Sequence, residues 1–235
     1  ARLDTNIISI ALPSIADWFN VPAAATSNLM LSFLLVITTL LLPMGYLADR
    51  LGFRRILMAG YFAFIAGSLL CGLAGNFILL IAARGVQGAG AAMLLISAFS
   101  MIPKRLAPDA IGRAMGWLSV AGSLGILIGA PLGGILTQWL TWRSIFLINL
   151  PLGLAAIFLV WQKLEPDAPQ NGAGNKTPFD WAGCLLAAFG LVLISFGLDR
   201  LRQIFFSMES MLPLAGGALV IIVFFQWQHR SDHPL

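Results

Sequence analysis

Charged side chains are scarce in this sequence. Only 10% of the 235 residues are Asp, Glu, Lys or Arg, whereas 59% are hydrophobic, and a soluble domain carries about 25% charged residues. The mean hydropathy of +0.88 also argues against an ordinary soluble protein. The composition therefore predicts a polytopic membrane protein.

Cysteine, histidine and catalytic motifs are nearly as scarce. Cys71 and Cys184 each lie inside an apolar run, so we expect neither a disulfide framework nor a metal cluster. No Walker, G-x-S-x-G or H-E-x-x-H pattern occurs, which argues against an ATP-driven pump and an enzyme. The 14 basic residues fall mainly in short loops and form no stripe for nucleic acid.

The apolar residues gather into eight segments, at 5–19, 27–46, 56–75, 77–102, 115–136, 145–161, 181–198 and 211–227. Most approach the roughly 20 residues that a helix needs to cross a bilayer. A helix also satisfies its own backbone hydrogen bonds in lipid. The first segment is short, so we expect its helix to begin upstream of Ala1.

A polar stretch rich in Gly, Pro and Asn separates six spans from two. We therefore predict a six-helix bundle at 1–163, a cytoplasmic linker at 164–180 and a helix pair at 181–228. Nine Lys and Arg residues fall on the linker side of the membrane and three on the other, which places the linker side in the cytoplasm.

A weak internal repeat favours two three-helix halves of opposite topology. Gly45-Tyr46-Leu47 is followed by Arg54-Arg55-Ile56, and Gly134-Ile135-Leu136 is followed at the same offset by Arg143-Ser144-Ile145. Chance similarity among Gly- and Leu-rich helices is the alternative.

The connection between the second and third spans reads G-Y-L-A-D-R-L-G-F-R-R at 45–55. Its glycines allow a tight reversal, and we expect Asp49 to meet the free donors at the start of the next helix. The stretch resembles the loop signature of the major facilitator superfamily, which implies a conformational latch. The latch residues would be Gly45, Asp49, Arg50, Gly52, Arg54 and Arg55.

Asp4 is the acidic residue that we expect to act within the membrane. The run L-D-T-N-I-I-S-I-A-L-P at 3–13 resembles the first-helix motif of proton-driven drug exporters, with Asn6 and Ser9 replacing its Thr and Asn. A carboxylate at membrane depth is costly when ionised, so it tends to face a cavity and can hold a proton. The alternative is an Asp near the membrane surface, capping the helix or solvated.

Arg84 is the basic counterpart. The run R-G-V-Q-G-A-G-A-A at 84–92 resembles the fourth-helix motif of the same exporters, which implies that Arg84 takes part in proton transfer. Arg84 and Gln87 are three residues apart and share a helix face, and an arginine there must pair or reach water. Snorkelling to the membrane surface is the alternative.

The fifth span has glycine at every fourth position over three turns, which predicts a flat stripe for close helix packing. It resembles the antiporter motif of exporters, except that Ala130 stands where that motif has proline. The residues of this predicted packing motif are Gly125, Gly129, Pro131, Gly133 and Gly134. A generic small-residue interface is the alternative.

A substrate cavity is expected among the second, fourth and sixth spans. Its predicted lining residues are Met30, Leu34, Gln87, Met93 and Asn149. Apolar members suit hydrophobic or cationic compounds, but they can equally face lipid or neighbouring helices. Asn149 can instead cap the helix break at Pro151.

Six spans followed by an extra pair resemble the N-terminal portion of the fourteen-helix drug:proton antiporter branch. The resemblance implies an all-α bundle of two inverted three-helix repeats, in a multidrug exporter of the bacterial inner membrane. It implies lipid, protons and small molecules as partners, and leaves room for a periplasmic adaptor and an outer-membrane channel. The proton gradient would drive export without a cofactor.

Residues 229–235 would begin the connection to a second bundle, so we expect that the chain alone does not transport. Two other readings stay open. One is a dedicated exporter or importer of a single compound, and the other is a non-transporting membrane scaffold. Buried charge at Asp4 and Arg84 argues against the scaffold, because a scaffold has no need for it.

Overall fold

The computed structural model describes residues 2–165, 167, 180–203 and 208–230, and every regular element among them is a helix. A short 3-10 turn, η1 (Ala23–Thr26), joins the first two helices. The helices are α1 (Arg2–Phe19), α2 (Ser27–Leu51), α3 (Phe53–Gly72), α4 (Phe77–Arg105), α5 (Pro108–Trp139), α6 (Ser144–Leu147), α7 (Asn149–Lys163), α8 (Trp181–Gln203) and α9 (Met208–Arg230). The predicted all-helical fold is confirmed.

Seven described segments are long and apolar enough to cross a membrane, counting α6 and α7 as one. The remaining long helix, α1, has 18 residues that include Arg2, Asp4 and Asp17. Several helices run past the predicted apolar segments, since α2 continues to Leu51 and α5 begins at Pro108. Polar residues at a membrane surface still form helical backbone bonds, which hydropathy does not register.

The sixth predicted span is interrupted at Ile148, between α6 and α7. Pro151 has no backbone amide to donate to Leu147, one turn earlier, so the helix loses a bond at this point. The backbone of Ile148 stays helical, with φ of −62° and ψ of −25°. Asn149, the first residue of α7, lies in the bundle interior, where it is 6% exposed.

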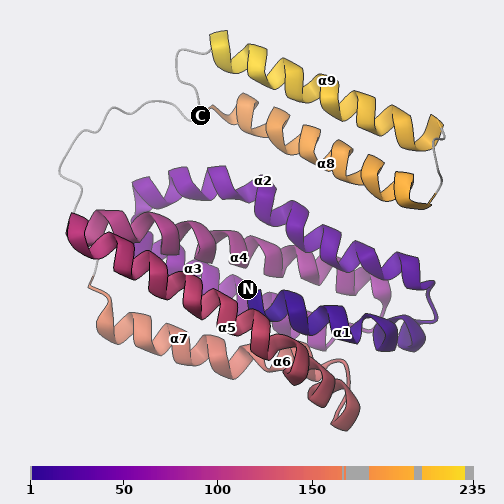
Figure 1. Ribbon diagram of the computed structural model, residues 1–235, viewed down its shortest axis with the longest axis horizontal. Helices are drawn as coiled ribbons and strands as arrows, with labels where there is room; N and C mark the ends of the chain where they lie inside the picture. The colour runs from indigo at the N-terminus through magenta and orange to yellow at the C-terminus, as the bar shows by residue number, and fades with distance from the viewer. Residues whose placement is uncertain (1, 166, 168–179, 204–207, 231–235) are drawn as a thin grey trace.

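The helix pair α8 and α9 lies along one edge of the bundle beside α2, and α7 lies at the opposite edge (Figure 1). Asp180 ties the pair together. Its Oδ1 accepts a bond from the Gly183 amide at 2.8 Å, and its Oδ2 accepts one from Gln228 Nε2 at 2.8 Å. Most of the predicted linker at 164–180, and residues 231–235, lie outside the described residues.

Three helix pairs of the bundle are related by the predicted inverted repeat, namely α1 with α5, α2 with α4, and α3 with α7. The extensive pairing of α3 with α4 has no counterpart of similar extent between α1 and α6–α7. If the two halves exchange places, α1 becomes α4 and α2 becomes α5, so the first two pairs map onto each other. The pair of α3 with α6–α7 maps onto itself. Symmetry of this kind is expected when two inverted three-helix repeats fold together.

Glycines on α5 bring α1 close. A Cβ placed on Gly129 would lie 3.1 Å from the Leu3 carbonyl oxygen, and one on Gly133 would lie 3.0 Å from the Ile7 carbonyl oxygen. Gly125 approaches Leu3 in the same way. Gly134 differs from the other members of the predicted motif, because a Cβ there would have nothing within 4 Å. Pro131 lies inside α5, which continues to Trp139.

The tightest approach to the middle of the bundle is between α3 and α4. A Cβ on Gly67 would lie 2.5 Å from the backbone nitrogen of Gln87 and 2.7 Å from its Cα. Those are backbone atoms, so no side-chain rotation can relieve the overlap. Gly67 thus allows the α4 backbone at Gln87 to reach α3.

Adding a methyl group at Gly67 is therefore expected to separate α3 from α4. We expect Gly67→Ala to lower the free energy of unfolding by about 1–3 kcal/mol, the usual cost of overpacking. The measurement is denaturant-induced unfolding of the purified chain in mixed micelles.

Gly134→Ala is the matched control. The added methyl group meets nothing within 4 Å, and alanine favours helix over glycine by up to about 1 kcal/mol. Equal destabilisation by the two substitutions would contradict the proposed role of Gly67.

Candidate functional site

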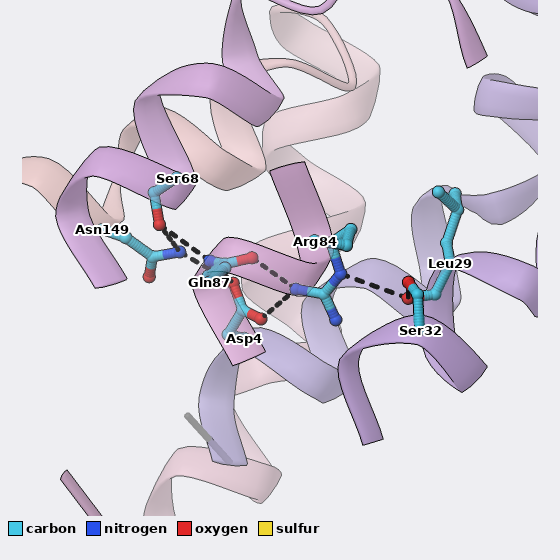
Figure 2. Close-up of polar contacts among 7 residues, drawn as sticks. All are labelled: Asp4, Leu29, Ser32, Ser68, Arg84, Gln87 and Asn149. Atoms are coloured by element: carbon cyan, nitrogen blue, oxygen red, sulfur yellow. Dashed lines mark hydrogen bonds and ion pairs between the residues drawn. The ribbon is translucent and has the colours of Figure 1, made fainter. Parts of the chain in front are cut away.

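A buried carboxylate stands at the centre of the polar contacts in the bundle. Asp4, on the first turns of α1, is 1% exposed. Its Oδ2 accepts a bond from Arg84 Nη1 at 2.8 Å. Its Oδ1 accepts bonds from Gln87 Nε2 at 3.0 Å and from Asn149 Nδ2 at 2.7 Å (Figure 2). Donors from α4 and α7 thus converge on one carboxylate of α1.

Arg84 is fully buried on α4 and makes contacts on several sides. Nη1 also donates to Gln87 Oε1 at 2.5 Å, and Nε donates to the Leu29 backbone carbonyl at 3.3 Å. The guanidinium carbon lies 4.0 Å from the centre of the Phe33 ring, a cation–π contact. Nη2 has no hydrogen-bond partner among the described residues.

Ser68 completes the cluster from α3. Its hydroxyl oxygen accepts a bond from Gln87 Nε2 at 2.7 Å and a longer one from Asn149 Nδ2 at 3.4 Å. Figure 2 shows Ser68, Gln87 and Asn149 grouped on one side of Asp4, with Arg84 and Leu29 on the other. Sequence reasoning missed Ser68, because a single serine in an apolar helix commonly bonds to its own backbone and carries no distinguishing signal.

The arrangement suits an ionised Asp4. A carboxylate is an acceptor only, and here it accepts from three side-chain donors. A protonated Asp4 no longer compensates the charge of Arg84. Its own O–H group is also a hydrogen-bond donor, and it would face the donors of Arg84, Gln87 and Asn149. Protonation of this one group therefore loosens contacts that join α1, α4 and α7.

An open space adjoins the cluster. A cavity of about 160 Å³ is lined by residues that include Asp4, Asn149 and Tyr61. A larger cavity of about 450 Å³ shares Leu3, Tyr61 and Leu94 with it and is lined mostly by apolar side chains. The carboxylate thus faces a space that continues into an apolar one.

The predicted cavity residues divide into two groups. Gln87 and Asn149 belong to the Asp4 cluster, whereas Met30, Leu34 and Met93 line neither of these two cavities. Met30 and Met93 pack against clusters of buried side chains, and Leu34 is 47% exposed on α2. The sequence of an apolar helix does not indicate which neighbouring helix or cavity each of its side chains faces.

The turn between α2 and α3 is centred on Gly52, whose φ of +95° favours glycine. Asp49 does not meet the α3 donors as predicted, because it pairs with Lys104 at the end of α4. Asp167 takes that role instead, and its Oδ2 accepts a bond from the Arg54 amide at 2.8 Å. Gly52 makes this possible, because a Cβ there would overlap the Asp167 carboxylate.

The other predicted latch residues lie around this turn. Arg105 donates to Asp167 Oδ1 at 2.7 Å, which joins the end of α4 to the same carboxylate. The Arg50 guanidinium lies 4.5 Å from the centre of the Tyr46 ring, and Arg55 is exposed. Gly45 packs α2 against Ile96 of α4. The turn is therefore bound to α4 and to the segment that follows α7.

Comparison with known proteins agrees with this geometry. The family model described as "Major Facilitator Superfamily" matches residues 1–229. The chain belongs to the major facilitator superfamily. It is therefore a multi-pass membrane protein of a transporter family and not an enzyme.

Relatives of this superfamily member carry resistance names. A multidrug resistance protein B homolog of Mycobacterium tuberculosis H37Rv is 34% identical over all of this chain and 43% of its own length. A lincomycin resistance protein of Streptomyces lincolnensis is 37% identical over 99% of this chain and 48% of its length. A putative multidrug resistance protein MdtD of Cronobacter sakazakii is 33% identical over 98% of this chain and 48% of its own length. The chain thus spans about half the length of these relatives.

Solved structures agree on the fold. A bacterial homolog of the human lysosomal transporter Spinster, in an inward-facing and occupied conformation, superposes with a TM-score of 0.57 at 20% identity. The match covers 98% of this chain and 59% of that one. The expected superfamily is confirmed by sequence and by fold.

Charge neutralisation at Asp4 is expected to be more costly than removal of the whole ion pair. Asp4→Leu leaves Arg84 buried without its counter-charge, and loss of one partner of a buried pair costs about 3–5 kcal/mol. Asp4→Leu combined with Arg84→Met removes both charges, so we expect it to be less destabilising than Asp4→Leu alone. Unfolding of the wild type, Asp4→Leu and the double variant in mixed micelles measures this. A double variant at least as destabilised as Asp4→Leu would contradict the pairing.

Asp49 and Asp167, the two carboxylates near the turn between α2 and α3, are expected to contribute differently to the free energy of unfolding. Asp49 and Lys104 are both more than half exposed, so Asp49→Asn should cost less than about 1 kcal/mol. Asp167→Ala removes both a cap on α3 and the partner of Arg105, for which we expect about 1–2 kcal/mol. The same unfolding assay compares them, and a larger loss for Asp49→Asn would contradict the assignment.

Proposed function

We propose that the chain forms one half of a proton-coupled exporter of hydrophobic or cationic compounds in the bacterial inner membrane. The observation that carries the proposal is the buried Asp4, which is held by Arg84 and opens to a cavity. A buried ionisable pair inside a membrane bundle marks a functional site by default, because a purely structural bundle gains little from it.

The coupling step follows from the contacts of Asp4. In the ionised form the carboxylate holds α1 to α4 and α7. A proton that arrives through the adjoining cavity neutralises it and weakens those contacts, and Arg84 is then free to bond elsewhere. Two bundles that rock about a central site can use such a change to favour one orientation.

The apolar cavity favours lipophilic substrates. Tyr61 lies on the boundary between the 450 Å³ space and the space beside Asp4. Its ring can stack on a cation, and the carboxylate beyond it can attract one once Arg84 moves. A cationic substrate and a proton would then compete for Asp4, which is the requirement for exchange of one for the other.

The relatives' names support efflux as the direction. Two bear multidrug resistance names, and the Streptomyces lincolnensis protein is named for resistance to a single antibiotic. That last name keeps a dedicated exporter as the second candidate. We propose that no bound cofactor is needed, since the proton gradient supplies the energy. A periplasmic adaptor and an outer-membrane channel remain proposed partners.

A transport assay tests the proposal. The complete polypeptide that carries this chain is reconstituted in liposomes, a pH gradient is imposed, and proton flux is followed when ethidium is added. We expect ethidium to release protons, and Asp4→Asn to abolish the release, because asparagine keeps the shape but cannot carry the proton.

Asp17→Asn is the matched control, since Asp17 lies exposed on the same helix and should leave the flux unchanged. Proton release that survives Asp4→Asn would place the coupling site elsewhere. No response to ethidium with a response to lincomycin would favour the dedicated exporter. We expect the 235-residue chain alone to give no flux.

A further inference from the structure

Two arginines join α3 to the α6–α7 segment at opposite ends. Near the start of α3, Arg54 Nη2 donates to the backbone carbonyl of Trp161 in the last turns of α7, at 3.1 Å. At the start of α6, Arg143 Nη2 donates to the backbone carbonyl of Ala74, just beyond the end of α3, at 3.1 Å. Each arginine therefore begins one span and binds the end of the other.

The two contacts are equivalent under the internal repeat. Arg143 lies 89 positions after Arg54, the same offset that relates the two Gly-x-Leu sequences. Each arginine follows an aromatic residue, Phe53 or Trp142. The cations over these rings differ, since Lys104 lies 4.5 Å from the centre of the Phe53 ring and Arg143 itself lies 4.5 Å from the centre of the Trp142 ring. Exchange of the two halves maps one contact onto the other.

These contacts suit helix ends. The last carbonyls of a helix have no partner within it, and a cation there also meets the negative end of the helix dipole. Between the two ends, glycines admit side chains from the opposite helix. A Cβ on Gly153 would lie 2.5 Å from Ile65 Cγ1, and one on Gly72 would lie 2.8 Å from Leu147 Cδ2. The register of the two segments is thus fixed along their length.

The same two segments carry Asn149, which donates to Asp4, and Ser68, which accepts bonds from Gln87 and Asn149. Ser68 lies on α3, and Asn149 begins α7, six positions after Arg143. A shift of one segment along the other would move Asn149 away from Asp4 Oδ1, which it reaches at 2.7 Å. The ionisable groups near Asp4 are Arg84 on α4 and Tyr61 and Cys71 on α3.

We propose that Arg54 and Arg143 are paired positioning residues that fix α3 against α6–α7 at the two membrane faces and thereby hold Asn149 against Asp4, with Ser68 in place beside Asn149 and Gln87. Neither arginine touches the carboxylate. Their effect on proton binding rests on the proposed function, whereas their effect on helix register does not.

Two measurements on the complete polypeptide test this. Spin labels at Leu73 and Thr141 report the spacing of the outer ends, and labels at Ala59 and Gln162 report the inner ends, all at exposed positions. Difference infrared spectra against Asp4→Asn report the bands of the Asp4 carboxyl group across pH. The variants are Arg54→Gln, Arg143→Gln, the double variant and Arg143→Lys, with the exposed Arg113→Gln as control.

We expect each glutamine variant to widen the spacing at its own end and the double variant to widen both. Arg143→Gln should also shift the carboxyl bands of Asp4, because Asn149 would no longer be held within hydrogen-bond distance of Oδ1. Arg143→Lys should restore part of the shift, and Arg113→Gln should change neither reading.

Unchanged spacing in the double variant would overturn the proposal. So would widened spacing that leaves the Asp4 carboxyl bands as in the wild type, because that result makes the arginines structural only. If Asp4 does not titrate in any protein, the proposed function fails, while the label spacing and the carboxylate bands still decide the positioning role.

Discussion

The buried ion pair between Asp4 and Arg84 is the interaction on which the rest of the bundle depends. Two charges removed from water require close pairing and further hydrogen bonds. Here those bonds come from α4 and α7 and from the backbone of α2. The pair therefore dictates where five helices must meet, because α3 also contributes Ser68 to the same cluster.

Small residues make that meeting possible. Gly67 brings the α4 backbone at Gln87 against α3, and Gly129 and Gly133 bring α5 against α1. In lipid, helices associate through close packing and polar contacts, since lipid is as apolar as their side chains. The glycines and the buried polar cluster thus act together, one allowing the approach and the other giving it a unique register.

Sequence alone predicted the fold class and the superfamily. It also singled out Asp4, Arg84 and Gln87, which the structure brings into contact, because charged residues inside apolar runs stand out and their spacing is recognisable. It failed where the answer depends on a partner far along the chain, since Asp49 was assigned the cap on α3 that belongs to Asp167. The assignment of Met30, Leu34 and Met93 to a substrate cavity stays a prediction.

The role of Ser68 was missed for a related reason. The sequence predicted a helix break at Pro151 and left Asn149 either in a cavity or as a cap, and only packing shows that Asn149 donates to Asp4. A serine in an apolar helix acquires meaning only when α4 and α7 are placed beside it. Long-range hydrogen bonds of this kind leave no local pattern to read.

We propose that Asp4 releases its proton when a cation occupies the adjoining cavity. Proton release by the purified, complete polypeptide can be measured in weakly buffered detergent solution when tetraphenylphosphonium is added, with Asp4→Asn beside it. We expect release that saturates with binding in the wild type and is absent in the variant. Release of equal size in both proteins, with cation binding intact, would contradict it.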